Sequence, residues 1–182
     1  MNFISSNYFK IYFRQIKVIL ERFYQYWTQL TYFKYLLFSL LLTIVFTLPT
    51  AVVIDFLKVS DKDIGGPKSI LDNIYTAIII GLIVAPIIET LLGQMLPIKL
   101  VQRYIKWNTN SVALIFSTMI FGLGHISYSI WYFFLVLPLG FVLAVTYLIF
   151  QKRQQSSFWT TTLLHSMRNS LALIATIDEI IK

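Results

Sequence analysis

Long apolar stretches separated by short charged ones dominate this sequence. Residues 35–54 carry no charge, and 107–151 contain nothing that titrates near neutrality except His125. A helix of roughly 20 apolar residues crosses a bilayer, and backbone polar groups in lipid must be satisfied within the segment. The pattern therefore predicts an all-α protein, a polytopic bundle of transmembrane helices. Five spans are expected, at about 35–57, 73–97, 111–128, 130–150 and 158–177.

The first 33 residues follow a different pattern, in which apolar residues recur at three- and four-residue spacing with basic residues between them. The apolar set is Phe9, Phe13, Ile16, Leu20, Tyr24 and Trp27, and the basic set is Lys10, Arg14, Lys17 and Arg22. This is typical of an amphipathic helix on an anionic membrane surface, and a helix packed against the rest of the protein is the alternative. We expect a membrane-surface helix over 1–34 and a transmembrane domain over 35–182.

Basic residues alternate between the two sides of the expected bundle. They precede the first span and fill the second and fourth loops, whereas the first loop mixes Lys with Asp and the third is uncharged. The positive-inside rule then places the N-terminus in the cytoplasm and the C-terminus outside, in a multi-pass protein of the cell membrane. The net charge of +7 is explained by this topology, so we expect no nucleic-acid partner.

Composition narrows the chemistry. The chain is 57% hydrophobic and 13% charged, which the wet surface of a soluble domain of this size does not allow. It has no cysteine, so disulfides, thiolate metal ligands and a cysteine nucleophile are excluded.

Few ionisable residues lie within the expected spans, and these are Glu89, His125, His165 and Arg168. Placing Asp, Lys or Arg at the bilayer centre costs at least about 2.5–3.5 kcal/mol, so such residues indicate function. In "HSMRN", His165 and Asn169 are four apart and share a helix face. Taken one at a time, an ion pair with Arg168 would account for Glu89, and helix packing would account for the histidines and Asn169. Their joint occurrence favours a shared site.

The residue types indicate hydrolysis. A carboxylate and two imidazoles that converge in a water-accessible cavity can bind a metal ion or activate water directly. Glu89 would act as general base, and Asn169 would donate to a developing oxyanion. Pro86, three residues before Glu89, is expected to kink the helix and free a backbone carbonyl. The implied reaction is cleavage of a peptide within the membrane.

These residues resemble the motifs of the CPBP family, the CAAX prenyl proteases and bacteriocin-processing enzymes also called Abi proteins. Its members carry Glu-Glu-x-x-x-Arg, Phe-x-x-x-His and His-x-x-x-Asn on separate transmembrane helices. Here Glu89 opens the first motif, Phe121 and His125 form the second, and His165 and Asn169 form the third. The resemblance implies an intramembrane endopeptidase in which Glu89 and His125 activate water.

The resemblance covers residues 86–170. It also implies roles for His165 and Asn169, a cofactor and a class of substrate. His165 and Asn169 would stabilise the oxyanion or help to hold a metal. The enzyme is then either a zinc metalloprotease, with Glu89, His125 and His165 as ligands, or a metal-free glutamate protease. The expected substrate is a peptide or lipidated protein that reaches the cavity from the bilayer or its inner face, and membrane lipids are the other partners.

The sequence departs from the family at two positions. Thr90 and Gln94 stand where the family has its second glutamate and its arginine. Neutral residues at both positions avoid the roughly 3–5 kcal/mol cost of a stranded buried charge, and we expect them to keep a hydrogen bond as a supporting pair. Arg168 is expected to reach the cavity, where it offsets charge near Glu89 or contacts the substrate carbonyl.

The departure keeps other functions open. A non-catalytic membrane immunity or regulatory protein could use the same cavity to bind a peptide. A small transporter or scaffold is disfavoured, because the spans show no repeat symmetry.

Overall fold

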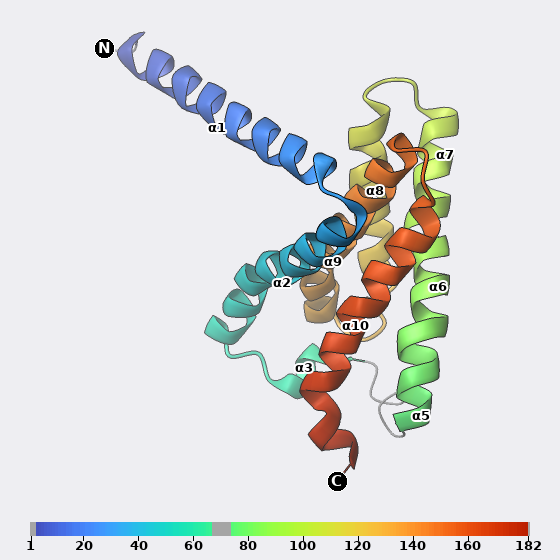
Figure 1. The fold of residues 1–182 in the computed structure, drawn as a ribbon. Helices are drawn as coiled ribbons and strands as arrows, with labels where there is room; N and C mark the ends of the chain where they lie inside the picture. The colour runs from blue at the N-terminus through green and yellow to red at the C-terminus, as the bar shows by residue number, and fades with distance from the viewer. Residues whose placement is uncertain (1–2, 67–73, 182) are drawn as a thin grey trace. The chain divides into compact units, whose positions relative to one another are not determined.

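The computed structural model describes residues 3–66 and 74–181, and the side chains of residues 14–66 and 74–176. These residues form helices joined by turns and contain no strand, so the prediction of an all-α protein is confirmed. The chain divides into two compact units, Met1–Phe38 and Ser39–Lys182, each of which is described by itself. The helices are α1 (Phe3–Gln29), α2 (Tyr32–Phe56), α3 (Asp61–Ile64), a long helix over Ile74–Tyr104, α8 (Thr109–Leu123), α9 (Ile130–Lys152) and α10 (Ser157–Ile181) (Figure 1).

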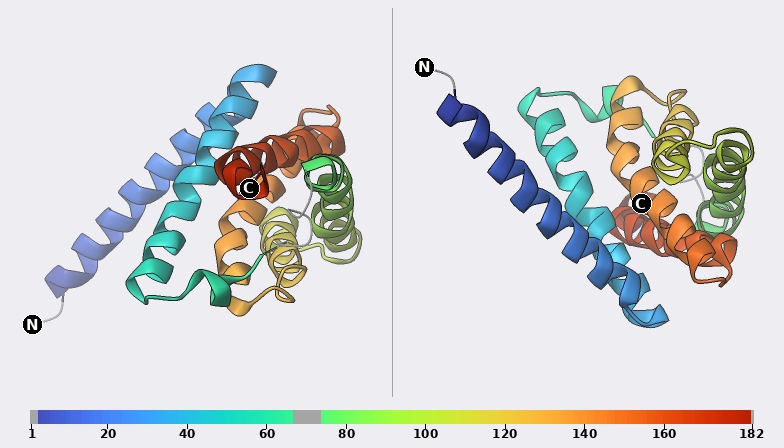
Figure 2. Two further views of the ribbon diagram at one scale, coloured as in Figure 1. Left: turned by 90° about the horizontal axis from the view of Figure 1, so that it is seen from below. Right: turned by 90° about the horizontal axis from the view of Figure 1, so that it is seen from above.

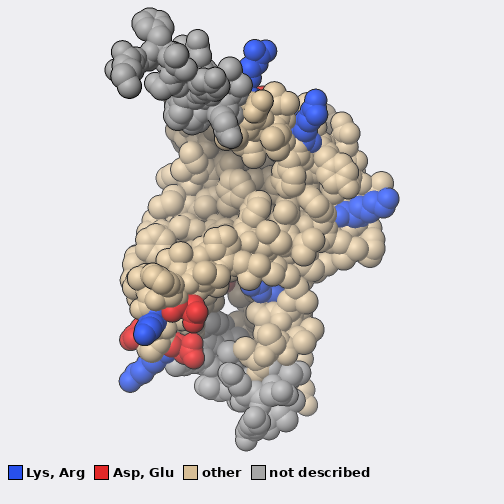
Figure 3. Space-filling view, turned by 90° about the vertical axis from the view of Figure 1, so that its left-hand side faces the viewer, with Lys and Arg blue, Asp and Glu red and all other residues tan. Residues whose placement is uncertain are grey.

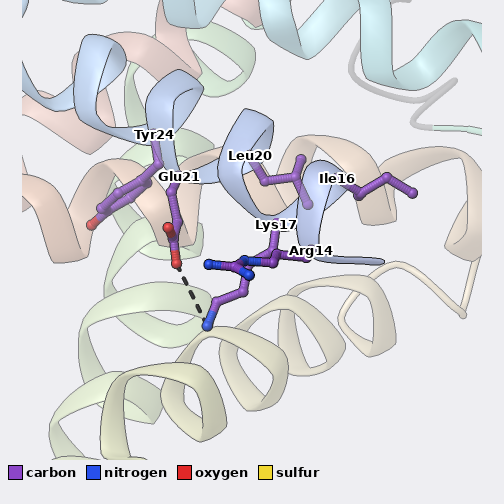
Figure 4. Close-up of a pocket in the computed structure, with 6 residues that line it drawn as sticks. All are labelled: Arg14, Ile16, Lys17, Leu20, Glu21 and Tyr24. Atoms are coloured by element: carbon purple, nitrogen blue, oxygen red, sulfur yellow. Dashed lines mark ion pairs between the residues drawn. The ribbon is translucent and has the colours of Figure 1, made fainter. Parts of the chain in front are cut away.

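The first unit consists of α1 and the start of α2. Trp27 is buried, and its ring stacks on Tyr35 with centroids 5.9 Å apart. Further toward the N-terminus of α1, apolar side chains such as Ile19 remain exposed. Figure 4 shows Lys17 and Glu21 pointing toward each other beside a depression that α1 lines alone, and their charged atoms are 3.7 Å apart. The helix has the expected amphipathic pattern, and its location on a membrane surface stays a prediction.

Three helices in the described part of the chain are long and apolar enough to cross a membrane. They are Tyr32–Phe56, Ile74–Tyr104 and Ile130–Lys152. The helix α8 is apolar but has only 15 residues, and α10 does not meet the same criteria of length and composition. The structure therefore supports three of the five expected spans, and the full count stays a prediction.

The long helix changes its winding before each of its prolines. It consists of α5 (Ile74–Thr76), η1 (Ala77–Val84), α6 (Ala85–Glu89), η2 (Thr90–Met95) and α7 (Leu96–Tyr104), where η marks a wider π-helical segment. The Ala85 N–H donates to the Ile80 carbonyl, five residues back. Pro86 follows and has no N–H to give to the next carbonyl, that of Gly81. The kink expected at Pro86 is thus a π-helical segment that leaves one carbonyl free.

The long helix, α8, α9 and α10 pack together in the second unit, and Figure 2 shows them along the bundle from both sides. Two glutamines, Gln102 and Gln151, exchange hydrogen bonds of 2.8 and 2.9 Å where α7 and α9 end. Near them lies a core cluster of Ile98, Val101, Ala113, Ala144 and Tyr147. The part of α2 that belongs to this unit packs on α9, since the ring centroids of Phe46 and Phe141 are 6.3 Å apart.

The second unit has two ends of different charge. At the end where α7 and α9 terminate, the charged residues are all basic; this "basic end" comprises Lys99, Arg103, Lys106, Lys152 and Arg153. At the other end, α9 begins next to α3, since the Ser129 hydroxyl donates to the Ile64 carbonyl at 2.6 Å. This "mixed end" comprises Asp55, Lys58, Asp61, Lys62 and Asp63. Figure 3 shows acidic and basic side chains gathered together at one place on a face that is otherwise mainly uncharged.

Candidate active site

Glu89, at the end of α6, lies between the two histidines. Its Oε2 atom is 3.5 Å from His125 Nε2 and 3.4 Å from His165 Nε2. The Glu89 side chain is 31% exposed, whereas that of His165 is only 2% exposed, so the carboxylate is the group that water can reach. Within the described residues no ion pair joins Glu89 to Arg168. Pairing of Glu89 with Arg168, the alternative expected from the sequence, is therefore wrong.

His125 lies in a turn, because α8 ends at Leu123 rather than near residue 128 as the sequence predicted. The backbone N–H of His125 turns back to Gly122 O at 2.9 Å, so it does not continue the helix by bonding to Phe121 O. The His125 ring takes the place of the backbone N–H as donor, and its Nδ1–H donates to Phe121 O at 2.8 Å. A side chain that satisfies one of the last carbonyls of a helix fixes its own orientation at the same time.

This hydrogen bond determines which ring nitrogen faces Glu89. A carbonyl oxygen can only accept, so Nδ1 of His125 carries a proton. In neutral His125 the Nε2 atom then has a bare lone pair directed at the Glu89 carboxylate, and two acceptors would face each other. A proton on Nε2 or on Oε2 turns this contact into a hydrogen bond and removes the repulsion. The pair is therefore arranged to accept and release a proton.

His165 projects from α10 into the same site. Its Nδ1 atom is buried and has no hydrogen-bond partner among the described residues. The neutral ring is then best protonated at Nε2, the nitrogen that faces Glu89. His165 can in this way donate a hydrogen bond into the site.

Phe121 supports both imidazole rings. Its ring centroid is 4.8 Å from that of His125 and 5.6 Å from that of His165. Two glycines on other helices leave room for it: a Cβ atom on Gly140 would lie 2.7 Å from Phe121 Cδ1, and one on Gly93 would lie 3.1 Å from Phe121 Cδ2. The sequence analysis did not single out either glycine, because neither lies near Phe121 in the sequence.

Asn169 is held by the carbonyl that Pro86 leaves free. Its Nδ2 atom donates to Gly81 O at 2.9 Å and so joins α10 to η1. The amide group has a second N–H, which this bond leaves available. Asn169 also lines the cavity that contains Glu89, so its position is compatible with donation to a substrate oxygen.

The pair expected between Thr90 and Gln94 does not form. The Thr90 hydroxyl is buried without a hydrogen-bond partner among the described residues. Gln94 instead donates to Gly140 O at 3.4 Å, and its side-chain oxygen is hydrogen-bonded to Ser117. Both residues belong to η2, and the Gln94 amide bonds to α8 and α9 rather than to Thr90. Gln94 alone therefore joins the long helix to α8 and α9 beneath the site.

Three further residues lie around the site. Tyr128 and Tyr132 line the cavity, and their rings are within 6.2 and 5.9 Å of the His125 ring. Neither tyrosine could be predicted, because the turn at His125 breaks the helical periodicity that would have linked them to it. Arg168 is half-buried near Tyr132, does not line the cavity, and has an Nε atom without a hydrogen-bond partner among the described residues.

Two cavities meet at Glu89 and His125. One has a volume of about 270 Å³ and runs between η1, α9 and α10, with Ala77, Tyr132, Leu139 and Thr176 in its walls. The other, of about 250 Å³, lies between α8 and the segment Ile88–Gly93. The carboxylate therefore has a polar position at the junction of two mainly apolar spaces.

The residues present do not form a metal centre as they stand. No group of three His, Cys, Asp or Glu side chains in the described residues is placed so as to hold a metal ion. Two ligand atoms of one tetrahedral zinc are roughly 3.3 Å apart for bonds of 2.0–2.1 Å. The Nε2 atom of each histidine is about this far from Glu89 Oε2. The pairwise spacing suits shared ligation, but the arrangement of all three side chains does not.

Comparison with known proteins gives one match. A family model described as type II CAAX prenyl endopeptidase Rce1-like matches residues 71–171, more than half of the 182 residues. The matched region contains Glu89, His125, His165 and Asn169. No curated protein and no solved structure matches the chain.

Proposed function

Since this chain belongs to the Rce1-like family of type II CAAX prenyl endopeptidases, we propose that it is an intramembrane endopeptidase. It hydrolyses a peptide bond in a membrane-associated or lipidated peptide. The observation that carries the proposal is the convergence of Glu89, His125 and His165 on one cavity, in a unit whose helices are apolar enough to cross a membrane.

Glu89 begins the reaction as general base. Its carboxylate takes a proton from a water in the cavity while the water oxygen bonds to the carbonyl carbon of the substrate. The electron pair of the carbonyl double bond moves to oxygen and gives a tetrahedral oxyanion. His125, held through Nδ1, keeps Nε2 against Glu89, where it shares the proton that Glu89 has gained.

The oxyanion is stabilised by donors from α10. The Nε2–H of His165 and the second N–H of Asn169 are the available groups, and both residues line the cavity. When the tetrahedral intermediate collapses, the C–N bond breaks and the nitrogen takes the proton from the Glu89–His125 pair. The products are a carboxylic acid and an amine, and transfer of the acid proton to the amine gives a carboxylate and an ammonium group.

A metal ion is not required by this sequence of steps. Zinc, if it binds, would polarise the substrate carbonyl and acidify water, and Glu89, His125 and His165 would be its ligands. Because these three side chains do not form a metal centre as they stand, no step of the proposal depends on one.

Substitution of Glu89 by Gln tests the proposal. The purified protein in proteoliposomes would be given a farnesylated peptide ending in a CAAX-type sequence, and an unmodified apolar leader-like peptide, each with a fluorophore and a quencher across the expected bond. We expect the Glu89→Gln variant to lose about 10²–10⁴-fold in cleavage rate, because the general base is removed. The matched control is Glu21→Gln, which changes an exposed carboxylate of α1.

The outcomes distinguish the alternatives. Equal cleavage by wild type and the Glu89→Gln variant would show that Glu89 is not the base. Binding of these peptides without cleavage by the wild type would favour the non-catalytic peptide-binding protein. Zinc in stoichiometric amounts in the purified protein, with activity lost on chelation and restored by zinc, would replace the metal-free steps.

A further inference from the structure

The cavity lies in one half of the membrane domain along the bundle axis. Glu89 is fifteen residues from each end of the helix Ile74–Tyr104, hence about 22 Å from either end at 1.5 Å per residue. From the level of Glu89, the walls continue to Ala77 near the start of this helix and to Thr176 on α10. Both residues lie toward the mixed end, as does Tyr132 near the start of α9. The larger cavity therefore extends from the site toward the mixed end.

Toward the basic end, the second cavity stops at Leu92 and Gly93, about one turn from Glu89, and the domain beyond it is closed by packing. On α9, the residues between Gly140 and the basic end are almost all buried, including Leu143 and Phe150 at 0% exposure. The core cluster around Ile98 and Tyr147 fills the same half. Beneath the site, Gln94 and Ser117 join the helices by hydrogen bonds. Water or a peptide would have to displace this core to reach Glu89 from the basic end.

Two glycines that follow α3 pack against the two tyrosines of the cavity wall. Gly65 has a φ of +70°, and a Cβ atom there would lie 3.0 Å from Tyr128 O. Gly66 approaches the Tyr132 ring in the same way, at 3.5 Å. These contacts place the two tyrosines that line the cavity next to the mixed-charge loop.

The charges indicate which side of the membrane each end faces. The basic end has five basic residues and no acidic one, whereas the described part of the mixed end has two basic and three acidic residues. Lysine and arginine in short loops are retained in the cytoplasm. The basic end is then cytoplasmic and the mixed end extracytoplasmic.

Together these observations assign a direction to the site. We propose that Glu89 is reached from the extracytoplasmic side, so that the substrate is an apolar peptide segment presented outside the cytoplasm or in the outer half of the bilayer. This rests on the proposed function, and it replaces the inner-face approach expected from the sequence. A cavity of about 270 Å³ is at the small end of ligand sites, so it holds only a short apolar stretch on either side of the cleaved bond.

Single cysteine variants test this direction, because the chain has no cysteine of its own. Lys62→Cys reports the mixed end and Lys106→Cys the basic end. Leu139→Cys reports the cavity, and its matched control is Leu143→Cys, one turn further along α9 in the dry core. Spheroplasts with the protein in the cell membrane would be treated with a small membrane-impermeant methanethiosulfonate, before and after permeabilisation.

We expect Lys62→Cys and Leu139→Cys to react in intact spheroplasts. Lys106→Cys is expected to react only after permeabilisation, and Leu143→Cys to react neither before nor after it. Reaction of Lys106→Cys in intact spheroplasts, with Lys62→Cys protected, would overturn the orientation. A second outcome would overturn access from outside. In it Lys62→Cys and Lys106→Cys react as expected, but Leu139→Cys reacts only after permeabilisation or not at all.

These outcomes are independent of turnover. The labelling pattern is expected to be unchanged when Glu89→Gln is added to each variant, so failure of the direction and failure of the proposed chemistry can be told apart.

Discussion

The two halves of α9 are equally apolar in sequence, yet they have opposite roles. Between Gly140 and Phe150 nearly every residue is buried, whereas between Ile130 and Leu139 only Phe133 and Val136 are. The half from Gly140 to Phe150 faces the core near the basic end, and the half from Ile130 to Leu139 lines the cavity near the mixed end. The comparison shows how one helix can both hold a site rigidly and leave access to it.

The candidate active site lies at the boundary between the two halves of α9. Phe121, with the two imidazoles beside it, lies against Gly140, the first residue of the closed half. A functional group needs rigid neighbours on one side and open space on the other. The closed half supplies the rigidity, and the open half supplies the space for water and substrate.

The largest effect is expected from a substitution at Gly140, where the closed half of α9 meets the site. In Gly140→Ala the new Cβ atom would lie 2.7 Å from Phe121 Cδ1, so the ring must move and both imidazoles with it. A displacement of about 1 Å in a catalytic group can cost roughly 10²-fold in rate, which is the loss we expect in the peptide cleavage assay. The control is Gly124→Ala, whose nearest contacts would be ordinary ones at 3.4 and 3.7 Å. Equal activity of the two variants would contradict the role given to Gly140.

A second experiment compares the halves directly, with Leu143→Ala in the core and Leu139→Ala in the cavity wall. We expect Leu143→Ala to lower the free energy of unfolding by about 2 kcal/mol, the low end for a buried leucine, because lipid is as apolar as the core and mainly packing is lost. Leu139→Ala is expected to cost less and to alter substrate preference instead. Titration with SDS in mixed micelles would measure the difference. Equal costs would mean that the cavity half is packed like the core.

The smallest effect concerns the hydrogen bonds beneath the site. Ser117→Ala removes the hydroxyl that lies within hydrogen-bond distance of Gln94 Oε1 and of Gly93 O, and one such hydrogen bond contributes a net ~0.5–1.5 kcal/mol. Thr118→Ala is the control, since its hydroxyl bonds only to Leu114 O within its own helix, at 2.8 Å. The same SDS titration measures both variants. A Ser117→Ala variant as stable as the control would show that Gln94 needs no partner there.

The helices and the candidate residues could be predicted from the sequence because they depend on local properties. A long uncharged run specifies a helix in lipid, whatever its neighbours. An ionisable residue such as Glu89 is conspicuous in such a run, and the spacing of His165 and Asn169 places them on one face. Two expectations failed: the helix around His125 ends in a turn that has no periodic signal, and Gln94 bonds to distant helices instead of to Thr90.

Only the tertiary structure decided what surrounds these residues. Asn169 donates to Gly81, 88 residues away, because Pro86 leaves that carbonyl free. The glycines that admit Phe121 and the tyrosines beside His125 were likewise brought there by folding. The closed and open halves also follow from packing, since an apolar residue is equally at home in a core, in a cavity wall or against lipid. By itself the sequence determined helices and a set of reactive side chains, and the contacts between distant helices decided their geometry and the direction of the cavity.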